Sequence, residues 1–289
     1  MSKKWSLLLL AGVFTSIACS QAISASAPQG KSLLPKKIDH IVVVVEENHS
    51  QQEIEGNPKA PYMNSLMKEG ASLTNYYAIE HPSQPNYLDL FSGSNQGVTN
   101  DKQPQNKFST DNLGAELIKH HYSFAGYSEG LPQAGYNGFS AGSAREGIYA
   151  RKHNPWVNFT NIPVEANKPL SLFSTDYTKL PTVSFVIPNM KHDMHDGSIQ
   201  EADVWLKNHL GSYVQWAKSH NSLLIVTWDE DDRSQKNKIP TFFVGPMVKQ
   251  GKFKDQANHF NLLRTIEDMY GLGHAGKSAS VAPILGIWK

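Results

Sequence analysis

The sequence predicts an α/β fold in which a mostly parallel central sheet is flanked by helices on both faces. Two apolar runs of the 289-residue chain carry this prediction, 41–45 and 223–226. Both are short, β-branched and uninterrupted, as in strands that are buried on both faces of a parallel sheet. The segment 198–219 precedes the second run and has the apolar periodicity of an amphipathic helix. This alternation favours a parallel sheet wrapped by helices.

The first elements follow an N-terminal lead-in. The first apolar run belongs to a predicted strand over 38–45. Prolines open a predicted helix over 58–68, and a glycine shortly after it provides the stop signal. The segment 71–79 is aromatic and β-prone, and it predicts another strand. The next helix is expected over 85–91, with Ser83 as its N-cap and a proline tolerated in its first turn.

The rest of the chain continues the alternation. Residues 92–105 have the composition of a solvated loop, and residues 128–180 predict a long ordered excursion near the active site, because they are rich in Gly, Asn and Pro and show little periodicity. The remaining predicted elements are a helix over 113–121, strands over 122–127 and 182–187, a helix over 198–219, strands over 223–228 and 241–244, and a helix over 260–269.

Residues 1–27 predict a secretory signal peptide, because two lysines precede an apolar stretch and small residues follow it. We expect cleavage after Ala22 or Ala27, one domain over 28–289, and a secreted or periplasmic protein without a stable membrane span. Cys19, the only cysteine, would be lost with the signal. Lipid anchoring at Cys19 is the secondary expectation, because Ser16 stands where a lipoprotein cleavage box usually has Leu.

The formal net charge is +1, and the lysines and arginines are spread along the chain. This pattern does not suggest nucleic-acid binding. Removal of Cys19 would also exclude disulfides and thiolate metal sites in the mature chain.

Acidic residues directly follow two predicted buried strands. Glu47 and Asn48 follow the first, and Asp229 and Glu230 follow the strand over 223–228. Ligands gather outside the carboxyl ends of strands in open α/β sheets. Carboxylate and amide oxygens suit Mg²⁺, Ca²⁺ or Mn²⁺. Either junction alone has an ordinary reading as the polar end of a strand, but two together predict one metal site.

Ser83 is the predicted nucleophile. A serine hydroxyl needs a base or a metal to activate it, and a divalent cation beside it would stabilise the alkoxide. A helix N-terminus at this position would also offer backbone amides to an anion. The alternative is a plain N-cap serine. The chain has no Gly-x-Ser-x-Gly elbow, so an α/β-hydrolase triad has little support.

Histidines extend the candidate site. Asp193 and His195 follow the strand over 182–187, and His259 lies at a loop-to-helix junction. Imidazole ligands leave a Zn²⁺ or Fe site open. A separate segment gathers positive charge that could grip a phosphate, or could consist of solvated loop charges. Its members are Arg151, Lys152 and His153.

The order of these motifs resembles the phosphoesterase family of the alkaline-phosphatase-like superfamily, which contains bacterial acid phosphatases and phosphatidylcholine-type phospholipases C. The motifs are His40 to His49, His81-Pro82-Ser83-Gln84-Pro85-Asn86-Tyr87, Tyr149 to Pro155, Asp193 to Gly197, Asp203 to Leu206, Thr227 to Glu230 and His259 to Glu267. The resemblance implies an alkaline-phosphatase-like core.

The resemblance also implies roles for the candidate residues. Ser83 would attack phosphorus to give a phosphoseryl intermediate. The cation ligands would be Glu47, Asn48, Asp229 and Glu230. The positions of Asp193, His195 and His259 are similar to a second metal site in two-metal members of the superfamily; alternatively, these residues contact phosphate or protonate the leaving group.

The sequence therefore predicts a secreted, metal-dependent phosphatase of the acid phosphatase type, which hydrolyses phosphomonoesters with Mg²⁺, Ca²⁺, Mn²⁺ or Zn²⁺. The first alternative is phospholipase C-like phosphodiesterase action on phospholipid headgroups; the family's phospholipases C are longer chains with an added C-terminal region. The second alternative is a noncatalytic phosphate- or cation-binding protein. The oligomeric state stays open.

Overall fold

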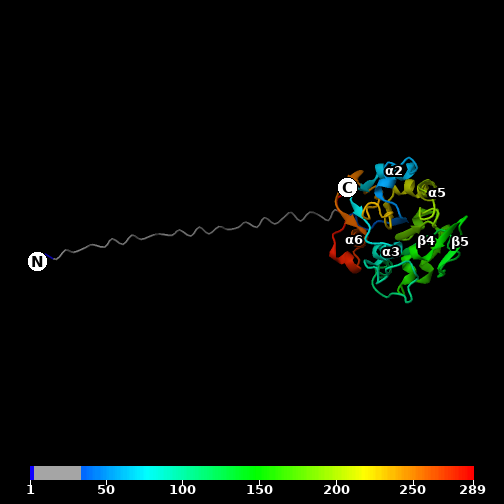
Figure 1. Ribbon diagram of the computed structural model, residues 1–289, viewed down its shortest axis with the longest axis horizontal. Helices are drawn as coiled ribbons and strands as arrows, with labels where there is room; N and C mark the ends of the chain where they lie inside the picture. Colours follow the sequence, from blue (N-terminus) through cyan, green and yellow to red (C-terminus); the bar gives the residue numbers. More distant parts are fainter. Residues whose placement is uncertain (3–33) are drawn as a thin grey trace. The chain divides into compact units, whose positions relative to one another are not determined.

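An eight-stranded sheet lies at the centre of the structure (Figure 1). The computed structural model describes residues 1–2 and 34–289, so the predicted signal peptide beyond its first two residues, with both expected cleavage sites, lies outside the described residues. The strand order is β11 (Gly251–Phe253), β2 (Ala71–Leu73), β10 (Thr241–Val244), β9 (Ser222–Trp228), β1 (His40–Glu46), β8 (Val183–Ile187), β4 (Phe124–Ser128) and β7 (Asn167–Pro169).

The strand β1 lies between β9 and β8 and pairs with both in parallel. Val43 of β1 is in register with Phe185 of β8 and Ile225 of β9, and all three side chains are fully buried. The carboxyl ends of these three strands therefore meet at one edge of the sheet. The predicted α/β class with a mostly parallel sheet is confirmed.

The strand β10 is reversed in this sheet. It pairs antiparallel with both β9 and β2, whereas β2 and β11 pair in parallel. A parallel neighbour needs a crossover connection, usually a helix, and no helix lies between β9 and β10. The short loop over 229–240 therefore returns the chain in the opposite direction.

Helices cover the sheet in two groups (Figure 1). The first group contains α2 (Pro61–Glu69) and α5 (Ile199–Ala217), which pack against each other. The second contains α3 (Ser83–Ser92), α4 (Leu113–Lys119) and α6 (His259–Tyr270). A capping box of Ser198 and Glu201 starts α5, and Asn258 caps α6. A short helix, α1 (Gln51–Ile54), follows β1.

The predicted strand over 71–79 is wrong as a single element. The structure divides it into β2 in the central sheet and β3 (Tyr76–Tyr77), which pairs with β12 (Ala257–Asn258) in a separate small sheet. The two residues between β2 and β3 lie in a turn. Local β-propensity cannot distinguish one long strand from two short ones, because partner strands decide where pairing ends.

The helix α3 begins at Ser83, two residues before the predicted start, and its N-cap is Pro82. The expectation of Ser83 as an N-cap is therefore wrong. The hydroxyl of Ser83 is consequently available for contacts beyond its own helix.

The excursion over 128–180 is ordered but contains little regular structure. Its elements are the hairpin of β5 (Ser140–Ser143) and β6 (Gly147–Ala150), the edge strand β7, and the 3-10 turns η1 (Arg151–His153), η2 (Pro155–Asn158), η3 (Val164–Ala166), η4 (Leu170–Leu172) and η5 (Tyr177–Lys179). Trp156 anchors it by packing against Phe91, Phe124 and Phe185 of the core. In the described part of the chain, no helix has the length and apolar character needed to span a bilayer.

Candidate active site

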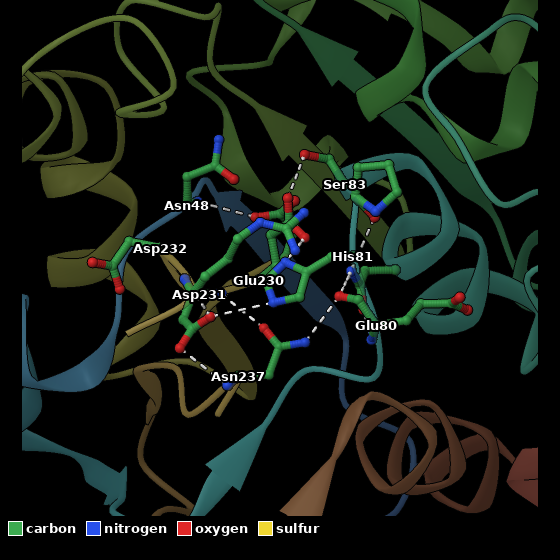
Figure 2. A network of polar contacts seen from close by, with 12 residues as sticks. Asn48, Glu80, His81, Ser83, Glu230, Asp231, Asp232 and Asn237 are labelled. Atoms are coloured by element: carbon green, nitrogen blue, oxygen red, sulfur yellow. Dashed lines mark hydrogen bonds and ion pairs between the residues drawn. The ribbon is translucent and has the colours of Figure 1, made fainter. Parts of the chain in front are cut away.

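The hydroxyl of Ser83 lies between two carboxylates at the carboxyl edge of the sheet. It donates to Oε2 of Glu47 at 3.0 Å and is 3.2 Å from Oε1 of Glu230. Figure 2 shows Ser83 and Glu230 facing each other within a wider network of polar contacts. Ser83 is 2 % exposed and Glu47 is fully buried. The structure thus brings the predicted nucleophile to two of the predicted cation ligands.

The parallel pairing of β1 and β9 explains this arrangement. Glu46 is in register with Trp228, so the next residues, Glu47 and Asp229, leave adjacent strand ends together. The backbone N–H of Asp229 donates to the carbonyl of Glu46 at 3.0 Å. The backbone N–H of Asn48 donates to Oδ1 of Asp229 at 3.1 Å. Tertiary pairing of two sequence-distant strands therefore builds the carboxylate site.

A second cluster adjoins Glu47. The Nε2 atom of His153 lies 3.0 Å from Oε1 of Glu47, and its Nδ1 lies 3.1 Å from Oδ2 of Asp193. All three side chains are buried, and one ligand atom from each falls within 4.8 Å of the others. The ring of His153 also stacks on Tyr87 of α3, with centroids 5.1 Å apart. These three residues could hold a metal ion.

Burial dominates the electrostatics of the site. It raises the pKa of Glu47, and the negative charge of Asp193 raises this pKa further. Burial likewise raises the pKa of Asp229, with added repulsion from Glu47 and Glu230. Burial lowers the pKa of His153, and the positive charges of Lys152 and His195 lower this pKa further. The site therefore concentrates acids that a cation would stabilise in their charged form.

Lys152 is the positively charged side chain that acts on Glu47 and Asp193 of this cluster. Its Nζ lies 2.9 Å from Oδ2 of Asp101 and 3.2 Å from Nε2 of His195. Burial lowers the pKa of Lys152, but the charges of Glu47 and Asp101 outweigh this effect, so the pKa is raised. Lys152 therefore remains an ammonium group at the edge of the site.

Arg151 is held by protein groups. Its guanidinium donates to Asn137 at 3.1 Å, to Asn158 at 2.6 Å and to the carbonyl of Val157 at 3.3 Å. These bonds tie the turn η1 to the rest of the excursion. They give the charge of Arg151 a structural role within the excursion.

The three residues predicted for a second metal site occupy two places. Asp193 accepts the backbone N–H of His195 at 2.8 Å, so these two share one turn. His259 instead contacts the carbonyl of Asp229 at 2.9 Å through Nε2 and the hydroxyl of Tyr76 at 3.2 Å through Nδ1. Burial lowers the pKa of His259 to about 4. His259 thus helps to fix the backbone carbonyl of Asp229.

Two residues of the site were not among the predicted functional residues. His81 contacts Glu230 and Asp231, and Asp101 contacts Lys152. His81 lies in the predicted Ser83 motif, and that position was the available signal. Asp101 lies in a polar loop with no distinguishing pattern. Its role depends on where that loop runs in space.

The chain matches known phosphoesterases. The model of the Phosphoesterase family matches residues 56–273. A phosphatidylinositol-3-phosphatase of Mycobacterium tuberculosis is 49% identical over 251 residues, which cover 86% of this chain and 82% of that protein. A phosphate-repressible acid phosphatase of Penicillium chrysogenum is 32% identical over 228 residues, covering 74% of this chain and 55% of that longer protein. The chain thus spans about half the length of this fungal relative.

The fold has solved counterparts. A protein of the alkaline phosphatase superfamily from Vibrio parahaemolyticus superposes with a TM-score of 0.62 at 14% sequence identity, over 88% of this chain and 72% of that one. This likeness concerns the fold alone.

Fold, site and relatives together define a phosphoric ester hydrolase with an alkaline-phosphatase-like architecture. The chain belongs to the Phosphoesterase family. The predicted family, fold and enzyme class are confirmed.

Proposed function

We propose that this protein is a metal-dependent phosphatase that hydrolyses phosphomonoesters through a phosphoserine intermediate on Ser83. The single observation that supports this proposal most directly is the position of the Ser83 hydroxyl between the buried carboxylates of Glu47 and Glu230. A structural N-cap serine bonds to a backbone N–H of its own helix. The hydroxyl of Ser83 instead bonds to two acids, and the N-cap of α3 is Pro82.

The donor set fits a divalent cation. Four buried atoms at the site have no hydrogen-bond partner among the described residues: Oε1 of Glu47, Nε2 of His153, Oδ2 of Asp193 and Oδ2 of Asp229. Glu47 and His153 are only 3.0 Å apart at these atoms, yet they form no well-aligned hydrogen bond. Buried polar atoms normally have partners, so this group of unpaired atoms supports a divalent cation as their common partner.

The ligand assignment follows from the residues at the strand ends. The proposed ligands are Glu47, Asn48, Asp229 and Glu230, with Asp193 and His153 next to them. Oxygen donors favour Mg²⁺, Ca²⁺ or Mn²⁺, whereas participation of His153 would admit Zn²⁺. When bound, the cation would supply Lewis-acid stabilisation of charge on the transferring group.

The protein's own groups supply the remaining steps. Ser83 Oγ attacks phosphorus, the bond from phosphorus to the leaving oxygen breaks, and the hydroxyl proton passes to a carboxylate already bonded to it. The leaving oxygen takes a proton from His195, which is partly buried and contacts Asp196 at 2.8 Å. Water then cleaves the phosphoserine to release phosphate and restore Ser83.

Lys152 is proposed to contact the phosphoryl oxygens, because its ammonium group lies beside His195 and is kept charged by the nearby acids. Arg151 and His153, predicted as further contacts, lie in the same turn η1. The proposal for His153 overlaps with its place in the candidate metal cluster.

The test uses a chromogenic phosphomonoester. We expect turnover to be lost in Ser83→Ala and in chelator, and to return when a divalent cation is added. Acid-quenched wild-type enzyme should contain phosphoserine at position 83 by mass spectrometry. Ser65→Ala, on α2, is the control and should keep wild-type turnover, since the hydroxyl of Ser65 bonds to the carbonyl of Tyr62 in the same helix. Full turnover of Ser83→Ala would contradict the covalent route.

A second candidate is action on a phosphorylated membrane lipid. The relative that is 49% identical over most of its length is named a phosphatidylinositol-3-phosphatase. Vesicles containing phosphatidylinositol 3-phosphate should then release inorganic phosphate faster than a soluble monoester does. Release of phosphocholine from phosphatidylcholine vesicles would instead favour phosphodiesterase action.

Secretion through residues 1–27 remains part of the proposal. N-terminal sequencing of the protein exported by a bacterial host should give a chain that starts after Ala22 or Ala27. Retention of the full N-terminus in the cytoplasm would contradict it.

A further inference from the structure

The imidazole of His81 lies between the carboxylates of Glu230 and Asp231 (Figure 2). Its Nδ1 contacts Oε2 of Glu230, and its Nε2 lies 3.4 Å from Oδ1 of Asp231. The side chain of His81 is 21% exposed, that of Glu230 is 7% exposed, and that of Asp231 is fully buried. Each ring nitrogen thus faces one acid, and the ring bridges them.

The Asp231 end of this bridge is fixed by the backbone. Oδ1 of Asp231 accepts the N–H of Arg233 at 2.8 Å. Oδ2 accepts the N–H of Gln235 at 2.7 Å and of Asn237 at 3.0 Å. With three backbone donors, Asp231 cannot follow a moving imidazole, so it serves as an anchor.

The backbone around His81 is fixed as well. Asn86, in the first turns of α3, donates to the carbonyls of Glu80 at 2.7 Å and Pro82 at 3.3 Å. Asn237 donates to the same Glu80 carbonyl at 2.9 Å, as Figure 2 shows. The loop that carries Asp231 and the segment that carries His81 are therefore joined independently of the ring.

This double anchoring determines the orientation of Glu230. One carboxylate oxygen of Glu230 is engaged by His81, and the other lies 3.2 Å from the hydroxyl of Ser83. A glutamate loses several rotamers when one oxygen is fixed in this way, which lowers the entropy cost of binding an ion. Groups that orient a ligand from behind typically account for about 10–100-fold in metal affinity.

We propose that His81 is a positioning residue that orients Glu230 beside Ser83 for a divalent cation. This inference rests on the proposed metal-dependent function. It requires contact through Nδ1, because that nitrogen faces Glu230 whereas Nε2 faces Asp231.

Two substitutions of His81 distinguish a contact through Nδ1 from a contact through Nε2. The amide nitrogen of His81→Asn lies near the position of Nδ1, whereas that of His81→Gln lies near the position of Nε2. Titration calorimetry with Mn²⁺ measures cation affinity without substrate. We expect His81→Asn to stay within a few-fold of wild type and His81→Gln to lose about 10–100-fold. Turnover of His81→Gln should recover at saturating Mn²⁺, because Ser83 itself is unchanged.

The matched control is His274→Asn. His274 also pairs with an aspartate, at 2.7 Å from Asp268, and its side chain is 31% exposed. It should keep wild-type Mn²⁺ affinity. Equal affinities of wild type, His81→Asn and His81→Gln would overturn the inference while leaving the proposed function intact, and equal losses in both variants would overturn the Nδ1 route. Wild-type protein that binds no Mn²⁺ and hydrolyses monoesters in chelator would overturn both the inference and the metal-dependent function.

Discussion

Asp101 and Lys152 form an ion pair of 2.9 Å at the first turn of α3. The other carboxylate oxygen of Asp101 accepts the backbone N–H of Gln84 at 3.0 Å. The side chain of Gln84 donates to the carbonyls of Asn100 and Lys102, both at 2.8 Å. The polar loop that carries Asp101 is thus fastened to the residue that follows the proposed nucleophile.

Replacing Asp101 by Asn should strengthen the inhibition of turnover by inorganic phosphate. The proposed phosphate contact Lys152 lies 2.9 Å from Asp101, so this carboxylate would repel a phosphate bound by Lys152. Two like unit charges about 5 Å apart repel by roughly 3 kcal/mol at an effective dielectric constant of about 20. Holding Lys152 in place contributes only about 0.5–1.5 kcal/mol. Repulsion outweighs positioning, so we expect the inhibition constant to fall at least about threefold. Asp111→Asn, an exposed control, should leave it unchanged, and a rise for Asp101→Asn would contradict the argument.

Cation binding should strengthen as the pH rises. Burial raises the pKa values of Glu47, Asp193 and Asp229, and a cation competes with protons for these carboxylates. Raised pKa values mean that the cation-free folded protein holds protons that the unfolded chain has released. Its stability is therefore present at low pH and is lost as the pH rises through this window. A bound cation removes that loss.

The measurement is the increase in Tm on adding Mn²⁺ to chelator-treated protein, at about pH 5 and about pH 7.5. We expect the larger increase at the higher pH. The buried His259, whose pKa is lowered to about 4, destabilises the folded state in acid with or without the cation. Comparing the increase in Tm, instead of Tm itself, cancels this effect. A larger increase at the lower pH would be inconsistent with carboxylate ligands.

Gly126 should be essential for packing the excursion over residues 128–180 against the core. A Cβ atom at Gly126 would lie 2.0 Å from Cζ2 of Trp156, so alanine must displace the indole. Trp156 lies three residues after His153, so the displacement reaches the candidate metal cluster. We expect Gly126→Ala to cost about 1–3 kcal/mol in the free energy of unfolding and to weaken Mn²⁺ binding.

Gly211→Ala is the matched control for this change. Gly211 lies in α5, and a Cβ there meets only the hydroxyl of Tyr62 at 3.6 Å, an ordinary contact. Alanine is favoured over glycine in a helix by about 1 kcal/mol, so this variant should be slightly more stable than wild type. Denaturant unfolding measures both variants. Equal stability of Gly126→Ala and wild type would show that Trp156 can move without cost.

The sequence alone was sufficient to predict the site residues that lie at the ends of strands. Glu47 and Asp229 come directly after buried apolar runs, and parallel strands necessarily bring such ends to one edge. The pairing of β1 with β9 was not readable, because the chain separates them by more than 170 residues and several strands had similar composition. Ser83 was selected by its motif, whereas its actual partners depend on that pairing.

The residues that the sequence did not reveal lie on loops. Asp101 resembles the other acids in polar segments, and only the folded path of its loop brings it to Lys152. The reversal of β10 and the division of 71–79 into two strands have the same origin, since tertiary partners override local propensity. Local patterns therefore predicted the elements better than the contacts between them.

Asp89 should make the protein less stable at alkaline pH. It lies in α3, is 1% exposed, and its Oδ2 has no hydrogen-bond partner among the described residues. Burial, with added repulsion from Glu80, raises its pKa to about 8. An unfolded aspartate titrates near about 3.9. The folded state thus keeps a proton that the unfolded chain releases, so stability is full below about pH 4 and falls by up to about 1.4 kcal/mol per pH unit towards pH 8.

Asparagine resembles the protonated carboxyl group and does not titrate, so Asp89→Asn should remove this loss. We expect its Tm to match that of wild type near pH 5 within a few degrees, and to exceed it by an increasing margin up to about pH 8. Asp255→Asn makes the same substitution at an exposed site and controls for the change from aspartate to asparagine. Parallel Tm curves for Asp89→Asn and wild type between these pH values would show that the Asp89 carboxyl group is already ionised in the folded protein.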